Sequence, residues 1–125
     1  MKVPFIRFSD IYTHDKDEIL EAIDRVASKG ELILGDYGKD ITELEKWFAE
    51  FTGTKHAIMC GSGTQALYLA YKALGIGPGD EIITVAHTFS ATFDQIVAVG
   101  ATPVLVDIGD DGLIDPLEIL RAVTP

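Results

Sequence analysis

The sequence predicts an α/β fold in which a mostly parallel sheet is covered by helices on both faces. Three short, almost wholly apolar runs, at residues 56–60, 81–85 and 103–107, have the length and composition of buried strands. A segment with helical periodicity follows each run, so crossover helices join the strands and the strands are parallel. Ligands bind such sheets beyond the carboxyl ends of the strands, and the functional residues are expected there.

A first helix is predicted from about Asp15 to Ser28. Acidic side chains in its opening turn suit the positive end of the helix dipole, and Gly30 is placed to end it. Residues 31–34 are predicted to be extended, and residues 35–38 to form a glycine-rich loop. Two interpretations of Tyr37 in that loop stay open. Either it contacts substrate or a second subunit, or it has no role in the site.

The second helix is predicted to begin with a capping box formed by Asp40 and Glu43, and to end at Thr52–Gly53. Apolar residues at helical spacing give it one heavy face: Leu44, Trp47, Phe48 and Phe51. An aromatic residue at this spacing belongs to a core more often than to a ligand site, so Trp47 is predicted to be core.

The third helix is predicted to begin directly after a small-residue turn, Gly61–Thr64. Such a turn leaves backbone N–H groups without intrahelical partners, all pointing the same way, at the positive end of a helix dipole. This arrangement is typical of a phosphate site, to which Ser62 and Thr64 add hydroxyl donors. The helix is predicted to end at Gly75. Its inward face is predicted to consist of Leu67, Ala70 and Leu74.

The remaining elements are bounded by turn and cap signals. Residues 77–80, Gly-Pro-Gly-Asp, predict a turn before the second strand. The fourth helix, Ser90–Val99, is predicted to stop at Gly100. It is predicted to bury Phe93, Ile96 and Val97. Residues 115–118, Asp-Pro-Leu-Glu, predict the start of a fifth helix, with a capping acid, a proline in the first turn and a reciprocal glutamate.

The dinucleotide class of phosphate ligand fits the second strand poorly. Gly61, Gly63 and Ala66 match the loose G-x-G-x-x-G/A pattern, but a dinucleotide site also needs an acid at the carboxyl end of that strand. The acids of this strand, Asp80 and Glu81, lie at its opposite end. The nucleoside-triphosphate loop is excluded, because no lysine follows Gly63.

Two ring-bearing residues, His87 and Phe89, follow the second strand at its carboxyl end. Aromatic rings stack on flat heterocycles, so a small, flat, monophosphorylated ring is the ligand that this edge favours. His87 stays open between a substrate-facing or acid–base group and a surface loop residue. Asp107, which ends the third strand at the same edge, stays open between a site residue and a turn residue.

Composition excludes several classes of function. The chain has 125 residues, of which 47% are hydrophobic, and this fits one domain with a core. Its net charge of −10 argues against nucleic-acid or anionic-membrane partners. Met1–Phe8 is too short for a signal sequence, and no apolar run approaches membrane-spanning length. The single cysteine, Cys60, forms no internal disulfide, which indicates a reducing cytoplasm. We interpret Cys60 as a small buried residue at a strand end rather than as a nucleophile.

Three segments together resemble the DegT/DnrJ/StrS-type sugar aminotransferases: G-S-G-T-Q-A-L, L-G-I-G-P-G-D-E-I-I-T-V-A-H-T-F-S-A-T and G-A-T-P-V-L-V-D-I. The resemblance runs from about Pro4 to Pro125. It implies the large domain of the fold type I, aspartate-aminotransferase-like enzymes, with pyridoxal 5'-phosphate as cofactor. In that family the turn that matches Ser62, Gly63 and Thr64 binds the cofactor phosphate, and the aromatic residue that matches Phe89 stacks on the pyridine ring.

The resemblance covers only the N-terminal third of the family's length. Residues 1–125 are therefore expected to be the N-terminal segment and the first three strand–helix units of a truncated large domain. The Schiff-base lysine is expected downstream, because none of the seven lysines, at positions 2, 16, 29, 39, 46, 55 and 72, follows a late strand. The 125-residue chain alone is expected to be inactive, with no catalytic residue of its own.

The family implies the reaction of the full-length protein. This is transfer of an amino group from an amino-acid donor, glutamate, to a keto group of a nucleotide-linked sugar by a cytoplasmic homodimer. Two alternatives stay open. One is a pyridoxal-phosphate-dependent sugar dehydratase of the same family, and the other is a non-catalytic module that binds phosphate ligands or a partner.

Overall fold

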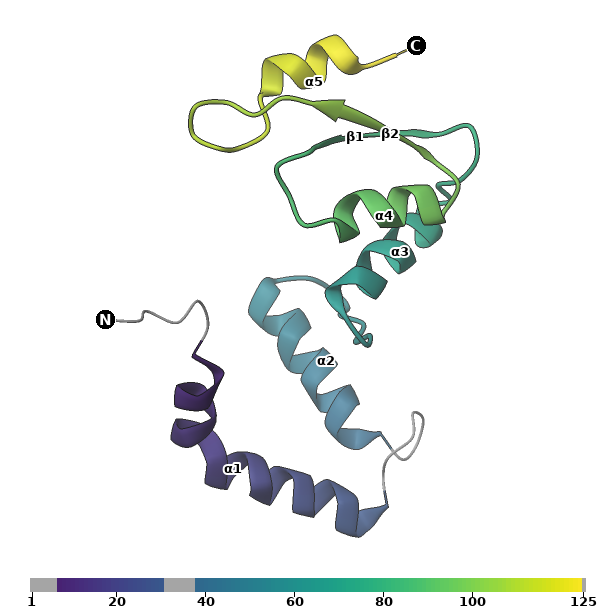
Figure 1. Cartoon of the computed structure of the whole chain (residues 1–125). Coiled ribbons are helices and arrows are strands. Elements are labelled where there is room, and N and C mark those ends of the chain that lie inside the picture. Colours follow the sequence, from purple (N-terminus) through teal and green to yellow (C-terminus); the bar gives the residue numbers. More distant parts are fainter. Residues whose placement is uncertain (1–6, 31–37, 125) are drawn as a thin grey trace, which may run out of the picture. The chain divides into compact units, whose positions relative to one another are not determined.

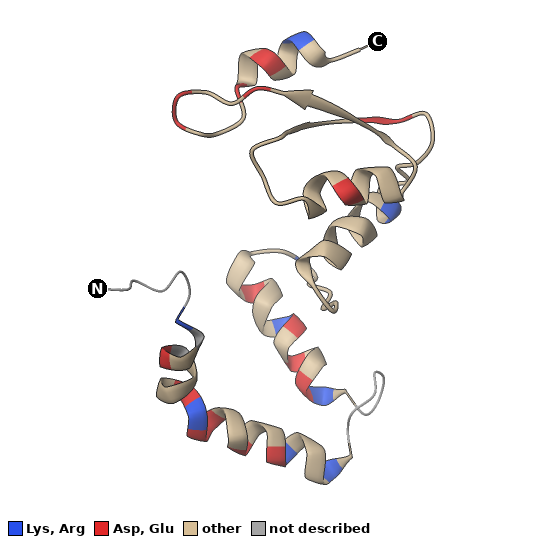
Figure 2. Ribbon diagram, in the orientation of Figure 1, with Lys and Arg blue, Asp and Glu red and all other residues tan. Residues whose placement is uncertain are grey.

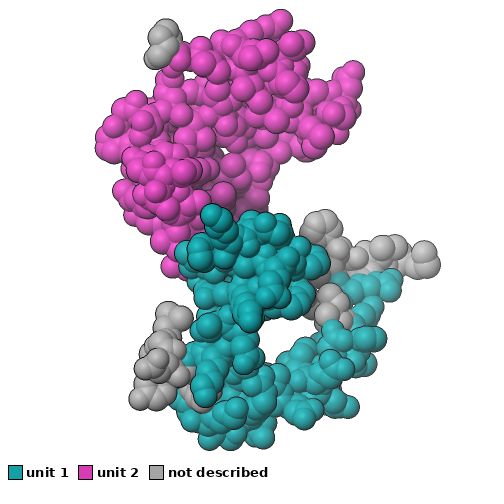
Figure 3. All heavy atoms as spheres, turned by 180° about the vertical axis from the view of Figure 1, so that it is seen from behind, with its two compact units in different colours: residues 1–59 teal, residues 60–125 magenta. Residues whose placement is uncertain are grey.

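The computed structural model describes residues 7–30 and 38–124 of the chain. The chain falls into two compact units, residues 1–59 and residues 60–125 (Figure 3). The predicted extended residues 31–34 and Tyr37 lie outside the described residues. No helix within the described ranges is long and apolar enough to cross a membrane.

The first unit contains two helices, α1 (Phe8–Lys29) and α2 (Lys39–Thr52) (Figure 1). Helix α1 begins seven residues before the predicted start at residue 15, and it ends where predicted. Gly30 has a φ of 69° and donates its N–H to Ala27 O. Helix α2 ends in the same way at Gly53, whose φ is 71°. Both glycines adopt the left-handed conformation that ends many helices, because a side chain there would be strained.

The predicted capping box of α2 is wrong. Gly38 is the N-cap residue, and no side chain caps this helix end. The carboxylate of Asp40 instead forms an ion pair with Arg25 on α1, with 2.6 Å between Nη1 and Oδ1. Asp40 lies inside the helix rather than before it, so its side chain is free to pair with a cation at the end of α1.

The predicted first strand at residues 56–60 is also wrong in this structure. Residues 56–60 form no strand, and the side chain of Ile58 is 82% exposed. A strand exists only where a neighbouring strand satisfies its backbone groups. Here the N–H of Met59 donates to the side-chain Oε1 of Glu45 at 2.8 Å, and no described strand pairs with this segment.

Three aromatic residues of the predicted apolar face of α2 contact one another. The rings of Trp47 and Phe51 are stacked, with centroids 5.3 Å apart and planes 11° apart. Phe48 lies against both rings. Trp47 is nevertheless 55% exposed, so the prediction that it is core does not hold for the described structure.

The second unit is built on a parallel pair of strands. Strand β1 (Glu81–Val85) pairs with β2 (Thr102–Val106) from Glu81↔Thr102 to Val85↔Val106. Three helices accompany them: α3 (Gly63–Ala73), α4 (Ala91–Ala98) and α5 (Pro116–Ala122). Helix α4 packs against both strands from one face and α5 packs on β2 from the other, as predicted for a parallel sheet (Figure 1). Helix α3 packs on α4.

The core of the second unit lies between α4, the strands and α3. Ile96, Val99 and Ala101 are buried at its centre. Four partly buried side chains pack around them: Tyr68, Tyr71, Ile76 and Ile82. Of the inward face predicted for α3, Leu67 is half-buried, but the prediction is wrong for Ala70 and Leu74, which are exposed. The two tyrosines of this helix, three residues apart on one face, contact the core, whereas Leu74 is 76% exposed. Of the α4 residues predicted to be buried, Ile96 is fully buried and Phe93 and Val97 are exposed.

The predicted turn at residues 77–80 and the predicted start of the fifth helix are confirmed. Asp80 N donates to Gly77 O at 3.1 Å, and Gly77 N donates to Asp80 Oδ2 at 2.8 Å. Asp115 caps α5 by accepting from Leu117 N at 2.8 Å, and Pro116 occupies the first helical position. The reciprocal bond predicted for Glu118 is absent, since its carboxylate pairs with Arg121 instead.

Candidate functional site

The N-terminus of α3 carries the predicted phosphate turn. Ser62 is the N-cap residue, with extended backbone angles (φ −168°, ψ 161°). Its Oγ accepts a hydrogen bond from Gln65 N at 3.1 Å, and its carbonyl oxygen accepts from Ala66 N at 3.0 Å. The Ser62 hydroxyl acts here as an acceptor, so its own hydrogen remains available to a ligand.

Backbone donors at this helix end are open to a ligand. Within residues 7–30 and 38–124, no hydrogen bond engages the N–H groups of Ser62, Gly63 or Thr64. All three residues are exposed. Unpaired N–H groups in the first turn of a helix point along its axis, and together they attract an anion.

The charge distribution along α3 also suits an anion. Its first turn contains no acid, and its last turn carries Lys72. Each of the other helices in the described part of the chain has an acid in its first turn: Asp10, Asp40, Asp94 and Glu118. Figure 2 shows α3 without an acidic residue along its length. The positive end of the α3 dipole is therefore not neutralised by its own first turn.

Gly63 leaves room for a ligand rather than serving the fold. Its φ is not in the left-handed region, and a Cβ placed on it would meet no atom within 4 Å. Nothing in the second unit therefore requires a glycine at this position. A close approach by a group from outside the chain is a reason to have one. The residues of the turn thus fit a phosphate group.

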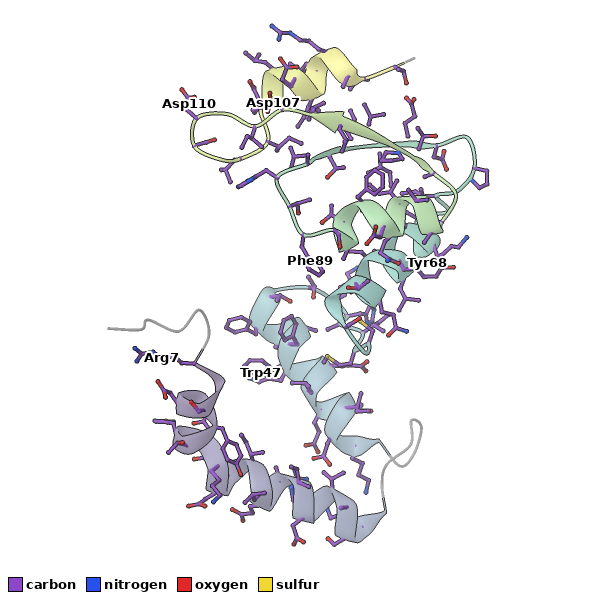
Figure 4. The ribbon with its side chains drawn as sticks, in the orientation of Figure 1. Arg7, Trp47, Tyr68, Phe89, Asp107 and Asp110 are labelled. Carbon is purple, nitrogen blue, oxygen red and sulfur yellow. The ribbon has the colours of Figure 1, made fainter. Side chains whose placement is uncertain are left out.

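Phe89 lies on the segment that leaves the carboxyl end of β1, directly before Ser90, the N-cap residue of α4 (Figure 4). Its ring is 76% exposed, so it is available to stack on a ligand. Its backbone is fixed, because Phe89 O accepts from Thr92 N at 3.0 Å. No hydrogen bond or ring contact of the described residues joins Phe89 to the phosphate turn.

The other candidates at this edge have different surroundings. His87 is exposed beyond β1, and Asp107 is exposed beyond β2. Because these strands are parallel, the two residues leave the same edge of the sheet, as predicted. Asp107 Oδ1 accepts from Ile108 N at 2.9 Å, a local bond typical of a turn residue. Cys60 is half-buried, ends no strand and lies with its Sγ 3.3 Å from Ser62 O, which corrects its interpretation as a buried strand end.

Sequence reasoning missed Gln65. Its Oε1 accepts from Gly61 N at 2.8 Å, and its N–H donates to Ser62 Oγ, so it joins both sides of the turn. The signal was present in the sequence: Ser62 and Gln65 have the S/T-x-x-E/Q spacing of a capping box.

Among the described residues we find no metal-binding group, and the hollow of the first unit does not contain the candidate residues at the N-terminus of α3 or after β1 and β2. The described residues contain no group of three or more histidine, cysteine, aspartate or glutamate side chains arranged to hold a metal ion. A hollow of about 360 Å³ in the first unit is lined by charged residues that include Glu45, Lys46 and Lys55. It holds none of the predicted site residues, and its lining includes both lysines and glutamates.

Known proteins resemble this chain over nearly its whole length. The model of the DegT/DnrJ/EryC1/StrS aminotransferase family matches residues 13–125. A "pleiotropic regulatory protein" of Geobacillus stearothermophilus is 44% identical over 99% of this chain and 33% of its own length. The UDP-2-acetamido-2-deoxy-3-oxo-D-glucuronate aminotransferase of Pseudomonas aeruginosa is 41% identical over 98% of this chain and 34% of its own.

A solved structure shares the fold. The crystal structure of NtdA from Bacillus subtilis with bound cofactor PMP matches with a TM-score of 0.88 and 36% identity. The match covers 99% of this chain and 28% of that one. The predicted fold class and the family resemblance are thereby confirmed. The chain spans about a third of the length of the relatives it matches.

Proposed function

This chain belongs to the DegT/DnrJ/EryC1/StrS aminotransferase family, and on that premise we propose that the whole protein is a pyridoxal-phosphate-dependent sugar aminotransferase. It transfers an amino group from an amino-acid donor, glutamate, to a keto group of a nucleotide-linked sugar. A relative named as an aminotransferase of a UDP-linked 3-oxo sugar supports the substrate class. The observation that carries the proposal is the open, acid-free N-terminus of α3.

The cofactor is pyridoxal 5'-phosphate, and the turn at Ser62–Thr64 holds its phosphate. The unpaired N–H groups of Gly63 and Thr64 donate to the phosphate oxygens, and the hydroxyls of Ser62 and Thr64 add two further donors. The field at the helix end adds attraction for the negative charge. A cofactor in its PMP form is bound in the structurally similar NtdA.

The exposed ring of Phe89 would stack on the pyridine ring and help to orient it. When bound, the cofactor supplies the electron sink for the reaction, so this chain contributes orientation rather than proton transfer. The fixed backbone of Phe89, held through its bond to Thr92, limits how far the ring can drift.

The lysine that binds the cofactor covalently belongs to another part of the protein. Of the lysines in the described ranges, Lys72 lies in the last turn of α3, at the opposite end from the phosphate turn. Its Nζ is 6.0 Å from the ring centroid of Tyr68. Residues 1–125 therefore bind and orient the cofactor but do not catalyse the reaction alone.

The whole protein is proposed to act as a homodimer in the cytoplasm. The side chains of Leu105, Leu117 and Leu120 are exposed on the second unit, and Trp47 and Phe51 on the first. Large apolar side chains that are exposed on both units suit burial against further protein. The thiol of Cys60 is free, which suits a reducing compartment.

The proposal is tested by incubating the whole protein with pyridoxal phosphate, L-glutamate and a UDP-linked 3-keto sugar. We expect release of 2-oxoglutarate in a one-to-one ratio with amino sugar. Residues 1–125 alone, under the same conditions, should release neither product. Loss of water from the sugar without consumption of glutamate would instead identify a dehydratase. Absence of any cofactor binding would contradict the proposal altogether.

A further inference from the structure

Gln65 fastens both sides of the phosphate turn. Its backbone N–H donates to Ser62 Oγ at 3.1 Å, while its side-chain Oε1 accepts from Gly61 N at 2.8 Å. In the usual capping box, a side chain at this position bonds to the N–H of the N-cap residue itself. Here the glutamine reaches one residue further, past Ser62 to Gly61.

This shift of one residue leaves the N-cap N–H unused. Had Gln65 bonded to Ser62 N, two consecutive donors would remain in the turn. Because it bonds to Gly61 N instead, three consecutive N–H groups, those of residues 62–64, have no partner in the described part of the chain. A run of successive backbone N–H groups is the arrangement that binds phosphate oxygens most effectively.

The turn needs such a fastening, because two of its residues are glycines. Gly61 and Gly63 have more conformational freedom than any other residue type, and a free turn would have to be ordered when phosphate binds. A bond that orders the turn beforehand removes this cost from the binding step. Resting on the proposed function, we propose that Gln65 is a positioning residue that holds the N–H groups of residues 62–64 ready for the cofactor phosphate.

The contact can be broken from either side. Gln65→Met removes the acceptor and keeps a long side chain with good helix propensity. Gly61→Ala acts from the other partner, since a Cβ on Gly61 would lie 3.0 Å from Gln65 Oε1 and would push the amide away. The two substitutions remove the same bond, so their effects on phosphate binding should not add.

The experiment measures dissociation constants of the whole protein for pyridoxal phosphate and for pyridoxal, which lacks the phosphate. We expect each single variant to bind pyridoxal phosphate about three- to tenfold more weakly, the range of one hydrogen bond. Binding of pyridoxal should be unchanged in both, and the double variant should be no weaker than either single one. Gln95→Met on α4 is the matched control, because no hydrogen bond of the described residues engages that side chain, and it should bind both ligands as the wild type does.

Three outcomes would overturn the positioning role of Gln65. These are an equal loss for both ligands, no loss for pyridoxal phosphate, and additive losses in the double variant. Thermal unfolding of the cofactor-free variants checks that they fold. If Gln65→Met does not fold, Gly61→Ala still tests the same contact. Failure of the proposed function has a different signature: the wild type itself would bind the two ligands equally or not at all.

Discussion

Gly100 lies so close to Pro78 that a Cβ added to Gly100 would be 3.0 Å from Pro78 Cγ. Gly100 follows α4 and has a φ of 90°, while Pro78 belongs to the turn that precedes β1. The contact joins the chain segments that lead into the two parallel strands. It also lies at the end of the sheet opposite the candidate site, because both strands begin there.

We therefore predict that Gly100→Ala destabilises the protein without reaching the cofactor. The variant meets both a close contact and a positive φ, and the backbone strain alone costs about 1–3 kcal/mol. Chemical denaturation of the whole protein measures this loss. Gly63→Ala is the control, since its added Cβ meets nothing within 4 Å and its free energy of unfolding should not fall. A Gly100→Ala protein as stable as the wild type would contradict the packing described for this turn.

Thr64→Val should weaken the cofactor and leave the fold unchanged. The Thr64 hydroxyl is exposed and has no partner among the described residues, so its removal breaks no internal bond. Loss of a hydrogen bond to a charged phosphate costs about 1–3 kcal/mol in binding. Calorimetric titration with pyridoxal phosphate measures this loss of affinity. Thr102→Val, at the first residue of β2, is the matched control and should bind pyridoxal phosphate as the wild type does. Equal affinities of the wild type and both variants would show that the Thr64 hydroxyl does not contact the phosphate.

Phe89→Ala should loosen the pyridine ring. We expect a loss of about 0.5–1.5 kcal/mol from stacking, together with lost apolar contact, in the binding of both pyridoxal phosphate and pyridoxal. Because the ring is 76% exposed, the stability of the cofactor-free protein should hardly change. Phe93→Ala on α4 provides the comparison, with a larger effect on stability and a smaller one on binding. The reverse pattern would place Phe89 in the core rather than in the site.

Asp115→Ala should destabilise the start of α5. The Asp115 carboxylate accepts from Leu117 N at 2.8 Å, and loss of an N-cap side chain costs about 0.5–2 kcal/mol. Asp115→Asn keeps an acceptor and should recover most of the stability. Hydrogen exchange of the α5 amides in the whole protein reports the change locally, and identical protection in the two variants would show that the cap contributes nothing.

Elements specified by local chemistry could be predicted from the sequence. The glycines that end α1 and α2, the turn at residues 77–80 and the Asp115 cap depend on neighbouring residues, and each was found. The strand at residues 81–85 has the predicted bounds, and the one predicted at residues 103–107 lies at residues 102–106; both are short apolar runs that pair with each other, so their pattern located them to within one residue.

Features that depend on distant partners could not be predicted in this way. Residues 56–60 have the composition of a strand, but no described strand pairs with them. Asp40 has the spacing of a capping residue, but Arg25 on α1 takes its carboxylate. On α3, Leu67, Tyr71 and Leu74 share one face by spacing, and only the packing of the second unit turns Tyr68 and Tyr71 toward the core while Leu74 stays exposed.

In the candidate site, the small-residue turn could be predicted because Ser62, Gly63 and Thr64 are consecutive and begin a helix; its role as a phosphate site stays a prediction. The capping-box spacing of Ser62 and Gln65 points to Gln65 as a residue of the turn, but spacing alone does not say whether its side chain reaches Ser62 or Gly61.

The most direct test of the phosphate turn is the binding of pyridoxal phosphate and pyridoxal to the whole wild-type protein and to its Gly63→Val variant. We predict that the wild type binds pyridoxal phosphate far more tightly than pyridoxal. The variant should lose most of that difference, because a β-branched side chain would stand where the phosphate approaches the open backbone at Gly63. A wild type that does not distinguish the two ligands would contradict the account. So would one stabilised against heat by NAD and not by pyridoxal phosphate.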